Sequence, residues 1–247
     1  MLGKNTNPSN EYYLIDKYVI NDGITHQFAV ICPGGGYFFV SLQKEGISFA
    51  EKLNEMGISA FIICYRVKEK AIYPAPMDDL AHGIRDIFNN IDKYHLDPSN
   101  YSIWGSSAGA HLASSFGTEN MGYKKYNLPK PNALILCYPV VTMTQKYAHQ
   151  GSHDMLLGDK PTEEMENFAS IEKNVTKNFP PTFLWCGDND QIVDPENSKM
   201  LAEQLKKFDV PHNFEIYPDV AHGVGLGVGT NAEGWVEKAV DFWMKQK

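Results

Sequence analysis

Residues 101–113, YSIWGSSAGAHLA, place two adjacent serines between an apolar run and a helix-like segment. The residues GSSAG at 105–109 fit the pattern G-x-S-x-G only with Ser107 in the middle, because a central Ser106 would be flanked by tryptophan and alanine. In that pattern the serine occupies a strained strand-to-helix turn, and the positions two residues away must lack side chains. A helix start there would favour developing negative charge. A serine that only caps the helix is the alternative, so catalysis requires partners elsewhere in the chain.

Short apolar runs alternate with longer amphipathic segments along the rest of the chain. We expect strands at 28–32, 59–66, 101–105, 133–138, 182–187 and 213–217, and helices within 41–57, 76–95, 195–208 and 231–246. Nearly continuous apolar runs are typical of parallel strands that are buried on both faces. The alternation predicts an α/β fold with a mostly parallel sheet and helices on both faces. A further strand around 12–20 would form a hairpin through the NDG at 21–23.

The chain length of 247 residues predicts one domain over 1–247. Residues 139–181 carry no strand pattern. A connection of that length is usually functional, so we expect a small cap-like insertion there, which we count after the sixth strand region of the core.

Composition excludes several classes of partner. The chain has 22 Lys and Arg against 30 Asp and Glu, and no basic run, which disfavours nucleic acid and anionic membranes as partners. The four cysteines each end an apolar run and form no C-x-x-C pair, which indicates reduced, structural thiols. Residues 1–13 are polar, and no apolar run approaches the length of a membrane span. We therefore expect a soluble, cytoplasmic protein, and its oligomeric state stays open.

A second glycine cluster directly follows the predicted strand at 28–32. Glycines in the segment VICPGGGYF at 30–38 let backbone N–H groups approach a ligand closely, so Gly35 and Gly36 are candidate oxyanion donors. The N–H of Ala108, the residue after the serine, would be the other donor. A dinucleotide-binding G-x-G-x-x-G fails because Phe39 occupies its last position, and no G-K-[ST] follows.

A nucleophilic serine also needs a base and an acid that orients it. His222 lies in the glycine-rich segment YPDVAHGVGLG at 217–227, after the last predicted strand. Asp190 and Asp188 both follow the strand at 182–187. We favour Asp190 as the acid and keep Asp188 as the second choice. The order Ser107, Asp190, His222 is that of the α/β-hydrolases.

Further histidine and acidic positions bear on catalysis or metal binding. His111 lies on the helix that Ser107 opens, where we expect it to be packed. His149, His153 and Asp154 have spacing that could suggest a metal site, but no third strong ligand motif accompanies them. We predict no metal and no organic cofactor.

Together these motifs resemble those of α/β-hydrolase esterases of the esterase and lipase superfamily, and they are similar to the acetyl esterase and acetyl-xylan-esterase-like group of bacterial carbohydrate esterases. The matching segments are PGGGY at 33–37, YPAPMDDL at 73–80, GSSAGAHLA at 105–113, PPTFLWCGDNDQIVDPENS at 180–198 and AHGVGL at 221–226. The resemblance implies Ser107 as nucleophile, Asp190 as acid and His222 as base. It also implies oxyanion donors at Gly35, Gly36 and Ala108, and a structural role for Asp79. Pro33 stands where many relatives have the histidine of H-G-G-G, which favours the sugar-esterase branch.

The expected function is hydrolysis of short-chain, chiefly acetyl, esters of sugars or small oligosaccharides through an acyl-enzyme. Tyr37 is the predicted substrate-binding residue, and Phe38, Phe39, Tyr73 and Tyr138 are further aromatic residues that could line a pocket. An arylformamidase or a broad-specificity carboxylesterase is the alternative enzyme. A non-catalytic hydrolase-fold protein that binds a ligand is the alternative from another class.

Overall fold

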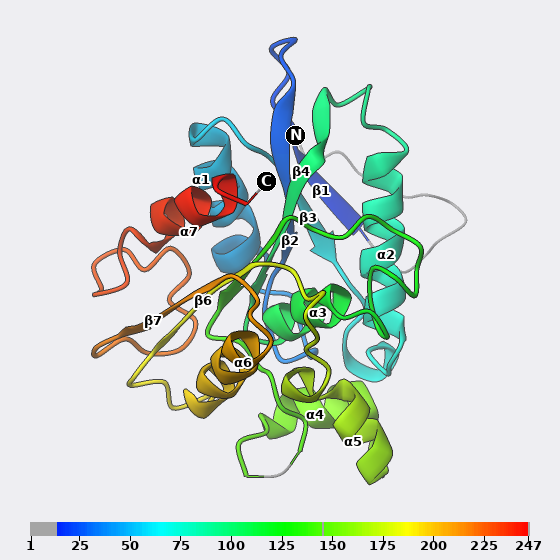
Figure 1. Ribbon diagram of the computed structural model, residues 1–247, viewed down its shortest axis with the longest axis vertical. Helices are drawn as coiled ribbons and strands as arrows, with labels where there is room; N and C mark the ends of the chain where they lie inside the picture. The colour runs from blue at the N-terminus through cyan, green and yellow to red at the C-terminus, as the bar shows by residue number, and fades with distance from the viewer. Residues whose placement is uncertain (1–13, 145, 247) are drawn as a thin grey trace.

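The computed structural model describes residues 14–144 and 146–246. A seven-stranded sheet forms the centre of this part of the chain (Figure 1). The strands are β1 Leu14–Tyr18, β2 His26–Cys32, β3 Ser59–Cys64, β4 Leu96–Ser106, β5 Ala133–Cys137, β6 Thr182–Gly187 and β7 His212–Tyr217. Their order in the sheet is β1-β3-β2-β4-β5-β6-β7, and every neighbouring pair from β3 to β7 is parallel. The six strands predicted from the apolar runs are confirmed, with β4 beginning earlier than expected.

The first strand pairs differently from the prediction. β1 runs antiparallel to β3, with Lys17 opposite Phe61, so the hairpin with β2 through residues 21–23 was wrong. Both edges of β2 are occupied, by β3 on one side and β4 on the other, whereas β3 offers an open edge. Residues 12 and 13 of the predicted strand lie outside the described residues, as does the polar segment 1–13 on which the expected localisation rests.

Helices cover both faces of the sheet, as the alternation of patterns predicts. They are α1 Ser48–Glu55 and α7 Trp235–Met244 on one face, and α2 Ala75–Phe88, α3 Ala108–Gly117 and α6 Glu196–Lys207 on the other (Figure 1). Successive side chains of a strand point to opposite faces. Accordingly Phe28 and Val30 of β2 pack with α2 and α3, while Ala29 and Ile31 pack with α1 and α7.

The described residues of the segment 139–181, which exclude residue 145, form short helices and no strand. They contain α4 Gln150–Leu157, α5 Glu163–Ala169 and the 3-10 turn η3 Ile171–Lys173, with α4 and α5 together at the lower end of the view (Figure 1). This segment follows β5, the fifth strand along the described chain, so its predicted place after a sixth strand region was wrong.

The predicted structural role of the cysteines agrees with their positions. Cys32, Cys137 and Cys186 are buried thiols within or at the ends of β2, β5 and β6. In the described ranges, no helix combines the length and apolar character needed to cross a bilayer.

The parallel strands set the position of the functional loops. In such sheets the carboxyl ends of parallel strands meet at one edge, where ligands usually bind. β2, β4, β5, β6 and β7 all end there, and the segments that carry the predicted site residues leave from these ends.

Candidate active site

Ser107 lies in a strained turn between β4 and α3. Its φ and ψ are 54° and −122°, a conformation that non-glycine residues rarely adopt. The two glycines of the motif are required by backbone contacts. A Cβ on Gly109 would lie 2.0 Å from the carbonyl oxygen of Cys32, and one on Gly105 would lie 2.4 Å from that of Gly109. The collisions thus involve neighbouring backbone rather than the serine side chain.

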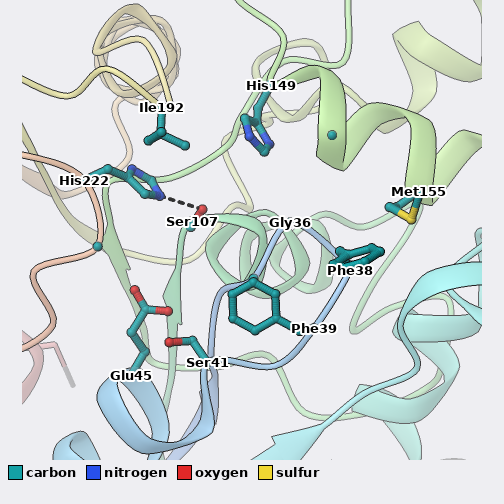
Figure 2. Close-up of a pocket in the computed structure, with 13 residues that line it drawn as sticks. Gly36, Phe38, Phe39, Ser41, Glu45, Ser107, His149, Met155, Ile192 and His222 are labelled. Atoms are coloured by element: carbon teal, nitrogen blue, oxygen red, sulfur yellow. Dashed lines mark hydrogen bonds between the residues drawn. The ribbon is translucent and has the colours of Figure 1, made fainter.

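The structure brings Ser107, His222 and Asp190 into one hydrogen-bonded chain. Ser107 Oγ lies 2.9 Å from His222 Nε2 (Figure 2), and His222 Nδ1 lies 2.6 Å from Asp190 Oδ2. A carboxylate beside Nδ1 holds the imidazole proton on that nitrogen, so Nε2 is free to accept the hydroxyl proton. This arrangement is the one that a nucleophilic serine requires.

Asp190, and not Asp188, faces the histidine. The other oxygen of Asp190 accepts the backbone N–H groups of Ile192 and Val193 at 2.9 Å each, which fixes the buried carboxylate. Asp188 points elsewhere and accepts the backbone N–H of Asp219 at 2.7 Å. The geometry therefore selects between the two aspartates that the sequence left open.

The glycine loop after β2 reaches the same place. Gly35 has φ of 127°, and its carbonyl accepts the N–H groups of Phe38 and Phe39 in a tight turn. A Cβ on Gly35 would lie 2.1 Å from the carbonyl oxygen of Phe39, so only glycine fits. Gly36 lines the same cavity as Ser107. Ala108 is the first residue of α3, and a helix leaves its first N–H groups without intrahelical partners.

A cavity of about 420 Å³, the active-site cavity, opens above Ser107 (Figure 2). Its lining comprises Gly35, Gly36, Phe38, Phe39, Ser41, Glu45, Ser107, His149, Gly151, Met155, Ile192, His222 and Gly223. A neighbouring cavity of about 330 Å³ shares Phe38 and Met155 with it and includes Lys68 and Asp154. The adjoining cavities could hold a substrate larger than a single small ester.

One buried carboxylate beside the site, that of Glu45, belongs to no motif in the sequence. Glu45 lies in the π-helical turn η1, Leu42–Ile47, and accepts the N–H of Gly34 at 2.9 Å and the hydroxyl of Tyr138 at 2.7 Å. The Tyr138 oxygen in turn accepts the N–H of Gly225 at 3.2 Å. The Tyr138 ring packs edge-on against His222, with centroids 4.8 Å apart. Glu45 and Tyr138 therefore connect the glycine loop to the histidine loop.

Comparison with protein-family models matches residues 17–205 to the model described as BD-FAE. The chain belongs to the BD-FAE family. This BD-FAE protein is 31% identical over 227 residues to the endo-1,4-beta-xylanase B of Butyrivibrio fibrisolvens, with 88% of this chain covered. It is 26% identical to an acetylxylan esterase of Xylanibacter ruminicola over 86% of this chain. The chain spans only 35% and 44% of the lengths of these two proteins.

Solved structures agree with the architecture of the BD-FAE protein. An acetyl ester-xyloside bifunctional hydrolase from Caldicellulosiruptor lactoaceticus matches with a TM-score of 0.83 and 32% identity, over 96% of this chain and 88% of that chain. An α/β hydrolase from a Medee basin deep-sea metagenome library matches with a TM-score of 0.69 and 24% identity, over 94% of this chain and all of the other. The predicted α/β-hydrolase fold and the resemblance to carbohydrate esterases are confirmed.

Tyr37 does not line the active-site cavity, so its prediction as a substrate-binding residue was wrong. Its side chain is 1% exposed, and its hydroxyl bonds His111 Nδ1 at 2.8 Å. Gly36 and Tyr37 both have positive φ, at 64° and 58°; the Tyr37 side chain lies in the core, and Phe38 and Phe39 line the cavity instead. His111 is packed as predicted, and burial lowers its pKa to about 4.

Of the other residues that the sequence singled out, some have structural contacts and one faces the cavity. Asp79 is buried and accepts Arg66 Nε at 2.9 Å, which confirms its structural role. His153 lies between the carboxylates of Asp154 and Glu166, at 2.9 and 3.0 Å, whereas His149 faces the active-site cavity. Across residues 14–144 and 146–246, no three His, Cys, Asp or Glu side chains gather as metal ligands would.

Proposed function

We propose that the chain is a serine carboxylic-ester hydrolase that acts on short-chain, chiefly acetyl, esters of sugars or small oligosaccharides. The observation that carries the proposal is the hydrogen-bonded chain from Ser107 through His222 to Asp190 at the wall of the active-site cavity. The names of the relatives support the substrate class, because they include an acetylxylan esterase and an acetyl ester-xyloside hydrolase.

In the first half of the reaction, His222 Nε2 takes the proton of the Ser107 hydroxyl while Oγ attacks the ester carbonyl carbon. Asp190 stabilises the imidazolium that forms. The N–H groups of Gly36 and Ala108, with Gly35 in the same loop, hold the negative oxygen of the tetrahedral intermediate, and one such donor is typically worth about 3–4 kcal/mol. The imidazolium then returns the proton to the departing alcohol, which leaves the acyl group on Ser107.

In the second half, His222 removes a proton from water, and the resulting oxygen nucleophile attacks the acyl carbon. The proton returns to Ser107 Oγ as the carboxylic acid departs, so the enzyme is restored. None of these steps needs a metal or an organic cofactor. The proposed chemistry requires a small-molecule ester and water.

The lining of the active-site cavity supports a sugar ester as the substrate. Phe38 and Phe39 are 54% and 55% exposed, and aromatic faces of this kind pack against the apolar face of a sugar ring. The same rings suit aryl groups, so an arylformamidase or a broad carboxylesterase is the second candidate. Hydrolysis of N-formylkynurenine faster than acetylated xylo-oligosaccharides would favour the former.

The experiment that tests the proposal compares two neighbouring serines. Wild type, Ser107→Ala and Ser106→Ala are assayed with p-nitrophenyl acetate and acetylated xylo-oligosaccharides. Ser106 is buried and is not part of the cavity lining, so its alanine variant should fold and keep activity. Ser107→Ala should lose nearly all hydrolysis. Equal activity in Ser107→Ala and wild type would refute Ser107 as the nucleophile, and wild type that hydrolyses neither substrate would favour a ligand-binding role.

A further inference from the structure

His149 projects into the active-site cavity from the segment 139–181. It immediately precedes α4, and in Figure 2 its ring faces the cavity from the side opposite Phe39 and Ser41. A Cβ on Gly36 would lie 3.6 Å from His149 Cε1, so the ring stands directly over the glycine loop. No step of the proposed mechanism uses this side chain.

The hydrogen bonds of His149 decide which ring nitrogen carries the proton. The backbone N–H of Ser152 donates to Nδ1 at 3.2 Å, and the Ser152 hydroxyl lies 2.8 Å from the same atom. A nitrogen that accepts a backbone N–H has no proton of its own, so the neutral ring carries its proton on Nε2. Burial, and then the nearby His222, lower the pKa of His149, which favours this neutral form. Nε2–H is thus a donor held in one orientation by the helix cap.

The position of the ring limits what this donor can bind. His149 Cε1 lies 3.6 Å from the Gly36 Cβ position and Nε2 lies 3.8 Å from the Gly151 Cβ position, and both glycines line the active-site cavity together with His149. In the proposed mechanism, the negative oxygen of the tetrahedral intermediate already has backbone donors in the glycine loop after β2. The methyl group of an acetyl ester has no hydrogen-bond acceptor, so acceptors elsewhere in the substrate belong to its alcohol half.

We propose that His149 Nε2–H donates a hydrogen bond to an oxygen of the alcohol half of the ester, a hydroxyl or ring oxygen of a sugar, and thereby selects sugar esters over aryl esters. The inference rests on the proposed function and adds a specificity-determining residue to it. The donor is fixed before the substrate binds, which lowers the entropic cost of forming the hydrogen bond.

The test measures kcat/KM for acetylated xylobiose and for p-nitrophenyl acetate with wild type, His149→Ser and Gln150→Ala. Serine retains an acceptor for the Ser152 N–H and so caps α4, but it carries no group at the position of Nε2. His149→Asn is a second capping variant, and thermal unfolding checks that both variants fold. Gln150 is exposed, lies on the same helix and is not part of the cavity lining, so it is the matched control.

We expect the ratio of kcat/KM values, sugar ester over aryl ester, to fall about tenfold in His149→Ser and to stay at the wild-type value in Gln150→Ala. An equal loss of kcat/KM on both esters would overturn the inference, because it would mean that His149 binds the carbonyl oxygen that both esters share or only stabilises the fold. An unchanged ratio in folded His149→Ser and His149→Asn would overturn it too. Wild type that hydrolyses neither ester would instead refute the proposed function, and the inference with it.

Discussion

Replacing Glu45 with glutamine should weaken both the fold and the proposed catalysis. The carboxylate accepts hydrogen bonds from the Gly34 N–H and the Tyr138 hydroxyl, and its side chain is 4% exposed. The amide has one oxygen and one NH₂ group, so one of the two donors must face another donor. Leaving one buried donor without an acceptor costs about 1–3 kcal/mol, and that is the expected loss in free energy of unfolding.

The activity of Glu45→Gln should fall as well, because Gly34 precedes the predicted oxyanion donors and Tyr138 packs on His222. A displacement of about 1 Å at a catalytic group can cost about 100-fold in rate, so we expect kcat for p-nitrophenyl acetate to fall about 10- to 100-fold. The double variant Glu45→Gln/Tyr138→Phe removes one of the two competing donors. Because Tyr138→Phe also removes the acceptor of the Gly225 N–H, the double variant should recover at most part of the stability lost in the single variant.

Urea unfolding and steady-state kinetics measure both effects, with Glu55→Gln as the control. Glu55 is 72% exposed and lies 4.0 Å from Lys52, so its loss should change stability by less than about 1 kcal/mol. If Glu45→Gln were as stable and as active as Glu55→Gln, the hydrogen bonds of Glu45 would not position the site, and the reasoning would be refuted.

Three further predictions concern the fold and the acid of the proposed triad. Asp190→Asn should lower kcat about 10⁴-fold, because the amide favours the wrong tautomer of His222. Asp188→Asn keeps an acceptor for the Asp219 N–H and should stay active. Similar kcat values for the two variants would contradict the choice of Asp190 as the acid. Gly109→Ala should lower the free energy of unfolding by about 1–3 kcal/mol or more, because its methyl group would overlap the Cys32 carbonyl. An unchanged midpoint of thermal unfolding would show that the turn can relax. Burial lowers the pKa of His111 from 6.5 to about 4, so between these values the unfolded chain binds a proton that the folded chain excludes. Stability should then fall with decreasing pH by up to about 1.4 kcal/mol per unit, and His111→Gln should show a shallower slope in urea unfolding at pH 4.5 and 7; equal slopes would argue against this origin.

Local patterns were sufficient for the strands and for two members of the proposed triad. The apolar runs identify the buried parts of β2 to β6 because strand residues that are buried on both faces are predominantly apolar, and the run in β7 is recognised although this edge strand is only partly buried. Gly105 and Gly109 single out Ser107 because a side chain at either position would overlap backbone. His222 follows from its glycine-rich loop after the last strand.

Other features depend on contacts that no local pattern encodes. β1 joins β3 because that edge is open in the assembled sheet, although the NDG sequence favours a hairpin. Asp190 and Asp188 occupy similar sequence surroundings, and only the direction of the loop after β6 decides which carboxylate meets His222.

The sequence by itself determined the α/β architecture, and it identified the proposed nucleophile and the loops that carry its proposed partners, because periodicity and glycine placement act through neighbouring backbone. Only the tertiary structure decided that Tyr37 packs against His111, that Glu45 joins Tyr138, and that His149 faces the cavity. Glu45 and Tyr138 are 93 positions apart, and such pairs meet only where the carboxyl ends of the parallel strands converge.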